Sequence, residues 1–278
     1  MQAIKLGNIE FDGNLDNTDP YIIGVFGAEG TGKTRFALTG PEVIGCVSLE
    51  TKSYKTISEV SAELGKRVYK PKDPQSLMVP IRKVDAMDDV KAQQWYKEHL
   101  KRVNDVIYAM LENKDVRTVM IDKFTTYCTW VQFAVNGMTG KKFMKVKDKV
   151  FQDNKELYQE IIDVMNSFSQ YKKLIVLLTA EKNEYANDKE TGRLISDGFK
   201  YFGSHTNVLV HLEENKFWKP KDEGGSKWKF RLNVRKAQGA THLDGPEGNP
   251  LLLAGDVSIP NLIYNIEGDE KFKLEEWQ

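Results

Sequence analysis

The feature that most constrains how this chain folds is a glycine-rich turn near its amino end, GAEGTGKT at residues 27–34. It follows an apolar run at 21–26 that has the composition of a buried strand, and it leads into a segment, 34–38, that we expect to be helical. The spacing G-x-x-x-x-G-K-T is that of a phosphate-binding loop, in which backbone N–H groups and the start of the next helix face a polyphosphate. The sequence therefore predicts a nucleoside triphosphate site in an α/β fold.

The residue types in this loop suit that chemistry. Its glycines let the backbone curl around an anion. Lys33 is expected to reach the β- and γ-phosphates, and the Thr34 hydroxyl is expected to take one coordination position on Mg²⁺. We therefore predict ATP and Mg²⁺ as cofactors, with the nucleotide bound by Gly27, Ala28, Glu29, Gly30, Thr31, Gly32, Lys33 and Thr34.

The metal ion needs a further acidic partner, and the segment 116–122 supplies a candidate. This segment, VRTVMID, is mostly apolar and ends on Asp122. An aspartate at the end of a core strand holds Mg²⁺ in P-loop proteins, opposite the hydroxyl of the loop. We therefore predict Thr34 and Asp122 as the metal-binding residues.

The carboxylate that activates water must come from another segment. Lys123 follows Asp122, so the chain lacks the arrangement in which a glutamate directly after this aspartate orients the attacking water. Glu50 ends the next predicted strand, 43–50, where a doubly wound sheet brings side chains to its ligand crevice. We predict Glu50 as the catalytic carboxylate, with Glu29 in reserve and with a solvated side chain at a strand end as the alternative for Glu50.

Strand-like and helix-like segments alternate after the loop, which is typical of a mostly parallel twisted sheet flanked by helices. The predicted strands are 43–50, 116–122, 173–181, 207–212 and 227–236, and the predicted long helices are 88–113 and 151–170. The strand at 227–236 alternates polar and apolar residues, which favours an antiparallel strand.

The chain is expected to form one main domain at 21–278, with an antiparallel C-terminal extension from about residue 205. Residues 1–20 are expected to be an N-terminal arm or edge hairpin, set off by a turn cluster that ends at Pro20. Residues 182–204 have no clear periodicity, so we predict a long irregular stretch there.

Composition excludes several classes of function. Forty basic and forty acidic residues cancel, so no global field draws the protein to DNA or to a membrane. No apolar run approaches 18 residues, and the first residues lack a signal-peptide pattern, so we expect a cytoplasmic protein without a membrane partner. Cys46 and Cys128 lie in apolar segments and are expected to be free, buried thiols.

Residues 136–149 form a local basic segment. It contains two glycines and five lysines with apolar residues between them, a composition that suits tracking a phosphate backbone. A solvated surface loop is the equally weighted alternative. The nucleic-acid candidates are Lys141, Lys142, Lys145, Lys147 and Lys149.

Five short blocks together resemble a known family. They are GAEGTGKT at 27–34, VSLET at 47–51, TVMIDKFT at 118–125, LIVLLTAEKN at 174–183 and FRLNVRKAQ at 230–238. In this order the sequence resembles the RecA-like ATPase core, and specifically the small AAA-type or RecA-like ATP-binding proteins of phages, some of which are single-strand annealing recombinases. If the chain is phage-encoded, the compartment is the host cytoplasm.

This resemblance implies further roles. Glu50 would activate water, and Glu181 or Thr179 would sense the γ-phosphate, giving Lys33, Glu50 and Glu181 as the catalytic set. The loops at 136–150 and 184–203 would face single-stranded DNA. Arg235 and Lys236 would reach the ATP of a neighbouring subunit in a homo-oligomeric ring or filament, unless they are simply charges at an exposed strand end.

Three functions follow from these features. The leading one is an ATP-binding and ATP-hydrolysing protein that binds single-stranded DNA and supports annealing or recombination. A nucleotide or small-molecule kinase is the second, although such kinases usually gather several arginines over the acceptor phosphate. The third is a nucleotide-switched interaction protein with little hydrolysis.

Overall fold

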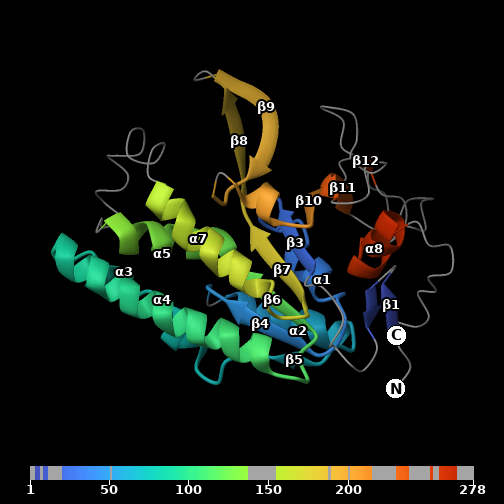
Figure 1. The fold of residues 1–278 in the computed structure, drawn as a ribbon, viewed down its shortest axis with the longest axis horizontal. Coiled ribbons are helices and arrows are strands. Elements are labelled where there is room, and N and C mark those ends of the chain that lie inside the picture. Colours follow the sequence, from blue (N-terminus) through green and yellow to red (C-terminus); the bar gives the residue numbers. More distant parts are fainter. Residues whose placement is uncertain are drawn as a thin grey trace.

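The computed structural model of this chain describes residues 4–6, 9–11, 21–50, 52–136, 155–186, 189–199, 201–214, 230–237, 251–252 and 257–267. Its main sheet contains β3 (Tyr21–Phe26), β4 (Ile44–Ser48), β5 (Val68–Tyr69), β6 (Thr118–Asp122), β7 (Leu174–Thr179), β10 (Val208–Glu214), β11 (Phe230–Ala237) and β12 (Leu251–Leu252). These eight strands lie in the order β12-β11-β10-β3-β7-β6-β4-β5 (Figure 1). A separate antiparallel pair, β1 (Ile4–Leu6) and β2 (Ile9–Phe11), lies within the predicted arm.

The strands from β10 to β5 are all parallel, and this explains their apolar sequences. A parallel strand is covered by helices on both faces, so its residues are buried in succession. Every residue of β4, β6 and β7 is buried. Neighbouring residues of β7, Ile175 and Val176, belong to the two opposite hydrophobic cores, as the period of two requires.

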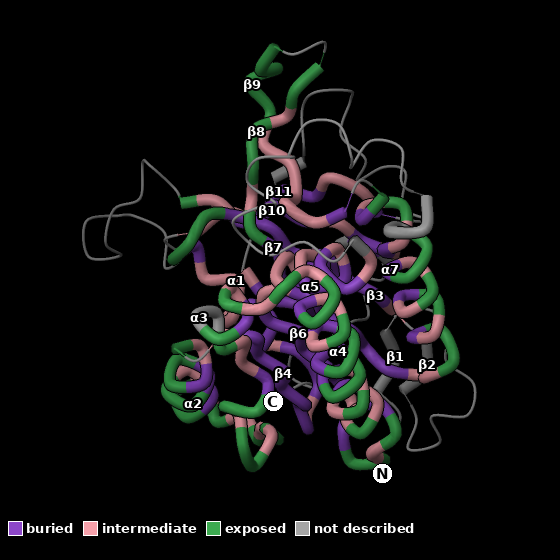
Figure 2. Tube along the Cα trace, turned by 90° about the vertical axis from the view of Figure 1, so that its left-hand side faces the viewer, coloured by how far each residue is buried: buried purple, intermediate pink, exposed green. Residues whose placement is uncertain are grey.

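Helices cover both faces of this sheet. They are α1 (Lys33–Ala37), α2 (Ser53–Glu63), α3 (Ile81–Val84), α4 (Asp89–Glu112), α5 (Phe124–Asn136), α7 (Lys155–Phe168) and α8 (Ile259–Glu267). Two short 3₁₀ helices are η2 (Pro74–Leu77) and η3 (Phe202–His205). One core packs beneath α4, α5 and α7, and the other beneath α1, α2 and α8; Figure 2 shows buried strands between partly exposed helices. Within the described residues, no helix is both long and apolar enough to cross a bilayer.

The longest helix shows how local sequence sets an element. The Asp88 side chain accepts a hydrogen bond from the Lys91 backbone N–H at 2.9 Å, which caps the start of α4. From there Tyr96, Val103 and Ile107 recur at helical spacing and are buried. The helix predicted at 88–113 is thereby confirmed at Asp89–Glu112.

The strand order identifies the architecture. The glycine-rich loop leaves β3, and β7 separates β3 from β6, which ends on Asp122. With β11 and β12 added antiparallel at one edge, this is the RecA-like P-loop NTPase fold predicted from the sequence. The predicted antiparallel extension from about 205 begins too early, because β10 pairs in parallel with β3 and the antiparallel strands begin with β11.

The prediction of an irregular stretch at 182–204 is wrong. Most of it forms an antiparallel hairpin of β8 (Glu181–Ala186) and β9 (Lys189–Ser196), followed by η3. This hairpin extends away from the main sheet (Figure 1), and most of its residues are exposed (Figure 2). A ribbon without a buried face needs no apolar alternation, so the pattern that marks a core strand was absent from its sequence.

Both cysteines are free and buried, as predicted. Burial raises the pKa of the Cys46 thiol and of the Cys128 thiol well above the ordinary range. Neither thiol therefore has the character of a reactive or metal-binding cysteine.

Candidate nucleotide-binding site

The phosphate-binding loop joins β3 directly to α1 at the carboxyl edge of the parallel sheet. Gly30 and Gly32 have φ angles of 81° and 83°, in the left-handed region that glycine adopts without strain. The Thr31 hydroxyl donates to the Ala28 carbonyl oxygen at 2.8 Å, which closes the turn from within. The sequence thus places glycines at the positions where the backbone of the loop turns.

Two of these glycines allow a matched test of the loop. A Cβ at Gly27 would lie 2.2 Å from the backbone oxygen of Leu212 in β10, whereas a Cβ at Gly30 would meet nothing within 4 Å. We expect Gly27→Ala to lower the free energy of unfolding by about 3 kcal/mol or more, because backbone must move to relieve the overlap. Gly30→Ala is expected to cost about 1–2 kcal/mol from its left-handed conformation alone. Urea unfolding of both variants measures the difference, and equal losses would contradict it.

Lys33 lies at the first residue of α1 and faces back into the loop. Its ammonium group donates to the carbonyl oxygens of Gly27 and Ala28 at 2.8 and 2.6 Å. Burial lowers the pKa of Lys33, while the carboxylates of Asp122 and Glu181 oppose this shift. The Lys33 cation is therefore stabilised by the charges of Asp122 and Glu181.

Asp122 is buried at the end of β6 and is paired in register with Ser48 of β4. Burial raises the pKa of Asp122, and the nearby Ser53 hydroxyl, the Lys123 cation and a hydrogen bond from the Ser48 hydroxyl oppose the shift. A carboxylate with hydroxyls beside it is an oxygen donor set of the kind that Mg²⁺ prefers, and Mg²⁺ completes its shell with phosphate oxygens and water. Among the described residues no group of three or more His, Cys, Asp or Glu side chains forms a metal cage by itself.

Glu50 lies close to Asp122 but is held by Lys123. The Lys123 ammonium is 2.8 Å from the Glu50 carboxylate, and the Ser53 hydroxyl donates to the same carboxylate at 3.3 Å. Lys123 has a φ of 61°, a left-handed conformation that costs a lysine on the order of 1–2 kcal/mol. The strained turn between β6 and α5 thus directs the Lys123 cation to Glu50. Lys123 stands at the position, directly after the aspartate, where some ATPases carry a catalytic glutamate.

Glu181 belongs to a second polar group at the same edge of the sheet. Its carboxylate is 2.8 Å from Nε2 of His211 in β10, and Nδ1 of His211 is 3.2 Å from the Arg235 guanidinium in β11. The His211 ring stacks on Phe26, the residue before Gly27, with 4.5 Å between ring centroids. Arg235 is therefore engaged within its own chain, whereas the resemblance implied a contact with a neighbouring subunit.

Lys236, the second residue implied to act across a subunit boundary, is also engaged within its own chain. Its ammonium donates to the carbonyl oxygens of Gly203 and Thr206 at 2.8 and 2.7 Å.

The remaining predicted site residues lie apart from these contacts. The Thr179 hydroxyl lies 2.7 Å from the Ser196 hydroxyl at the base of the hairpin, and Glu29 is exposed on the loop. The lysine segment at 141–149 lies outside the described residues.

Three residues near the loop were not predicted from the sequence as site residues. In the sequence Lys123 shows only that a glutamate is absent after Asp122, and His211 is a single polar residue within a predicted strand, which by itself predicts no site. The third is Phe230, whose ring would lie 3.1 Å from a Cβ added at Gly32 and therefore packs on the loop. Phe230 lies inside the predicted strand 227–236, and no sequence signal singles it out, since the observed strand begins at this residue.

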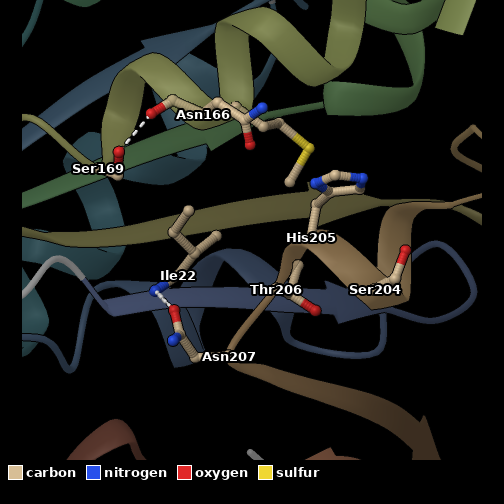
Figure 3. A pocket seen from close by; sticks show the side chains of 8 residues that line it. Ile22, Asn166, Ser169, Ser204, His205, Thr206 and Asn207 are labelled. Atoms are coloured by element: carbon tan, nitrogen blue, oxygen red, sulfur yellow. Dashed lines mark hydrogen bonds between the residues drawn. The ribbon is translucent and has the colours of Figure 1, made fainter. Parts of the chain in front are cut away.

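A shallow hollow of about 210 Å³ lies at the opposite edge of the sheet. Figure 3 shows its polar lining, including His205 and Asn207, whose side-chain oxygen accepts from the Ile22 backbone N–H at 2.7 Å. Ile22 and Asn207 stand at the amino ends of β3 and β10, whereas the loop leaves the carboxyl end of β3. The hollow is therefore not part of the nucleotide site.

No protein-family model matches this chain, and no curated protein matches it. Among solved structures, the RadB recombinase aligns with 80% of this chain and 84% of its own, at 10% sequence identity and a TM-score of 0.43. A KaiC-like protein from Pyrococcus horikoshii OT3 aligns over 86% of this chain and 89% of its own, at 12% identity and a TM-score of 0.40. Because both similarities are distant, the assignment of the fold rests on the strand order of this chain.

Proposed function

We propose that this chain binds and hydrolyses ATP with Mg²⁺ at residues 27–34, binds single-stranded DNA, and supports annealing or recombination as a homo-oligomeric ring or filament. The observation that carries the proposal is the meeting of a phosphate-binding loop with three carboxylates, those of Glu50, Asp122 and Glu181, at one edge of the sheet.

The proposed roles follow from the contacts of each side chain. Lys33 would exchange its bonds to the Gly27 and Ala28 carbonyls for phosphate oxygens, which are stronger acceptors. Thr34 and Asp122 would hold Mg²⁺, which supplies neutralisation of charge on the β- and γ-phosphates when it is bound. Glu50 would orient the attacking water, and its pairing with Lys123 would keep its carboxylate fixed near the metal site.

Two features support single-stranded DNA as the partner. The exposed hairpin β8–β9 starts at Glu181, directly after the strand next to the loop, and carries Lys182, Lys189 and Arg193. Tyr185 on this hairpin is 62% exposed, although its hydroxyl is bonded to Glu190. An exposed aromatic ring suits stacking with an unpaired base. Two of the cations are shared with acids of the same segment, since Lys182 pairs with Asp197 and Arg193 with Glu184. The lysine segment at 141–149 adds further positive charge in the sequence.

Filter binding of a labelled single strand, with and without ATP, tests this proposal. Replacing Lys141, Lys142, Lys145, Lys147 and Lys149 by alanine is expected to weaken binding about tenfold or more and to flatten its salt dependence, because fewer counterions are released. The matched control replaces five exposed lysines elsewhere, Lys55, Lys83, Lys97, Lys101 and Lys114, and is expected to bind almost as the parent does. Unchanged affinity in the first variant would contradict the DNA assignment, and turnover of nucleoside monophosphates would favour a kinase.

A further inference from the structure

Three side chains from three strands form a continuous polar chain beside the loop. Glu181 begins β8, His211 lies in β10 and Arg235 lies in β11. His211 is 1% exposed and is paired in register with Phe26, on whose ring it stacks with an angle of 7° between the planes. The imidazole is therefore fixed in position between the carboxylate on one side and the guanidinium on the other.

The partners of His211 determine which ring nitrogen carries the proton. A guanidinium has only N–H donors, so Nδ1, 3.2 Å from Arg235, must be the acceptor. Nε2 then carries the hydrogen and donates it to the Glu181 carboxylate at 2.8 Å. The contacts are thus satisfied by a neutral ring in the Nε2–H tautomer, and by neither of the other two forms of histidine.

We infer that His211 is a positioning residue for Glu181: its Nε2–H fixes the direction of the carboxylate, and Arg235 fixes the tautomer that makes this bond. The inference rests on the proposed function, together with the role of γ-phosphate sensor that the resemblance implies for Glu181. The His211 ring stacks on Phe26, the residue before Gly27, and its Nε2 is 2.8 Å from Glu181, which places the carboxylate beside the loop. Arg193 and Glu213 are the charged groups that act on Arg235 from β9 and β10.

This arrangement would keep the Glu181 carboxylate in place beside the phosphates of a bound nucleotide. An unrestrained glutamate would turn away from a γ-phosphate, since like charges repel. A hydrogen bond from a buried ring holds Glu181 against this repulsion, and the Arg235 cation behind the ring offsets part of its charge. The geometry of Glu181 then stays the same when nucleotide arrives.

Nitrogen NMR of the folded protein tests the tautomer without any nucleotide. The chain has four histidines, His99, His205, His211 and His242, so ¹⁵N-histidine labelling gives few signals, and the His211→Gln protein assigns the one that disappears. We expect an Nε2–H ring for His211 near neutral pH. An Nδ1–H ring, or a doubly protonated one, would overturn the inference.

Hydrolysis by two variants tests the positioning. His211→Phe keeps a ring against Phe26 but removes both hydrogen bonds, and we expect kcat to fall about 10- to 100-fold with KM changed little, as for other residues that orient a reacting group. His211→Gln has an amide N–H for Glu181 and an oxygen for Arg235, so it is expected to recover kcat to within a few-fold of the parent.

The outcomes separate this inference from the proposed function. If the parent hydrolyses ATP and His211→Phe does so equally well, the inference fails and the function stands. If the parent and Lys33→Ala are equally inactive, the function fails, while the NMR result still reports the tautomer. Melting temperatures of both His211 variants, measured alongside, must stay near that of the parent for the loss of kcat to count as support.

Discussion

Replacing Lys33 by alanine is expected to reduce ATP hydrolysis by about 100- to 1,000-fold, equivalent to roughly 3–4 kcal/mol of lost transition-state stabilisation. The ammonium lies inside the loop, on the Gly27 and Ala28 carbonyls, where it would meet the charge that develops on the transferred phosphoryl group. Steady-state phosphate release measures the rate, and calorimetric titration with a nonhydrolysable ATP analogue measures the accompanying loss of affinity.

The fold is expected to survive this substitution. Burial lowers the pKa of Lys33, which means that the folded protein holds the charged form at a cost, so its removal gives no reason for unfolding. Lys55→Ala is the control: that side chain is 83% exposed and pairs with Glu59 at 3.7 Å, so neither activity nor stability should change appreciably. Hydrolysis at the parental rate by Lys33→Ala would remove the basis for placing a nucleotide on this loop.

The sequence predicted those parts of the molecule that have a strong local cause. The loop spacing, the apolar run before it and the acid at the end of a buried strand each follow from one chemical requirement. They placed Lys33 and Asp122 at the same edge of the sheet, where Asp122 acts on Lys33 electrostatically. Helix α4 was equally clear, because its buried residues recur at helical spacing over 24 residues.

The remaining parts depend on partners far away in the chain. Lys123 reaches Glu50 only because a left-handed turn directs it there, and no pattern in the sequence announces a left-handed lysine. His211 contacts Glu181 of β8 and Arg235 of β11. These contacts depend on which strands lie side by side, and the sequence does not show that. The sequence places Arg235 on the correct strand, but it does not show whether the side chain contacts its own chain or a neighbouring subunit.

Glu50 and Glu181, the two candidate catalytic carboxylates, have different surroundings, and the difference separates their expected roles. Glu50 is paired with a lysine whose side chain is 44% exposed, next to the predicted metal site. Glu181 is bonded to a buried histidine and acts electrostatically on Lys33. Under the proposed function, Glu50 would orient a water near Mg²⁺ and Glu181 would detect the γ-phosphate. Hydrolysis by Glu50→Gln and Glu181→Gln proteins distinguishes the two roles.

Lowering the pH from 7 to 4 is expected to remove up to about 3 kcal/mol from the free energy of unfolding through a single residue, His99. His99 is fully buried between Trp95 and Trp130, with ring centroids 4.8 and 4.7 Å away. Burial, with a smaller effect of the Arg102 cation, lowers its pKa from 6.5 to about 4. Between these values the unfolded chain binds a proton that the folded chain does not. Stability from this residue is therefore complete above pH 6.5 and is lost as the pH falls toward 4.

Urea unfolding of the parent and of His99→Phe across this range isolates the effect. Phenylalanine keeps an aromatic ring between Trp95 and Trp130 but cannot take up a proton, so the variant is expected to lose less stability than the parent between pH 6.5 and 4. The raised pKa of Asp122 contributes with the opposite sign, but it does so in both proteins and cancels from their difference. The difference should be constant above pH 7. Parallel curves down to pH 4 would show that the imidazole takes up its proton within the folded core at little cost.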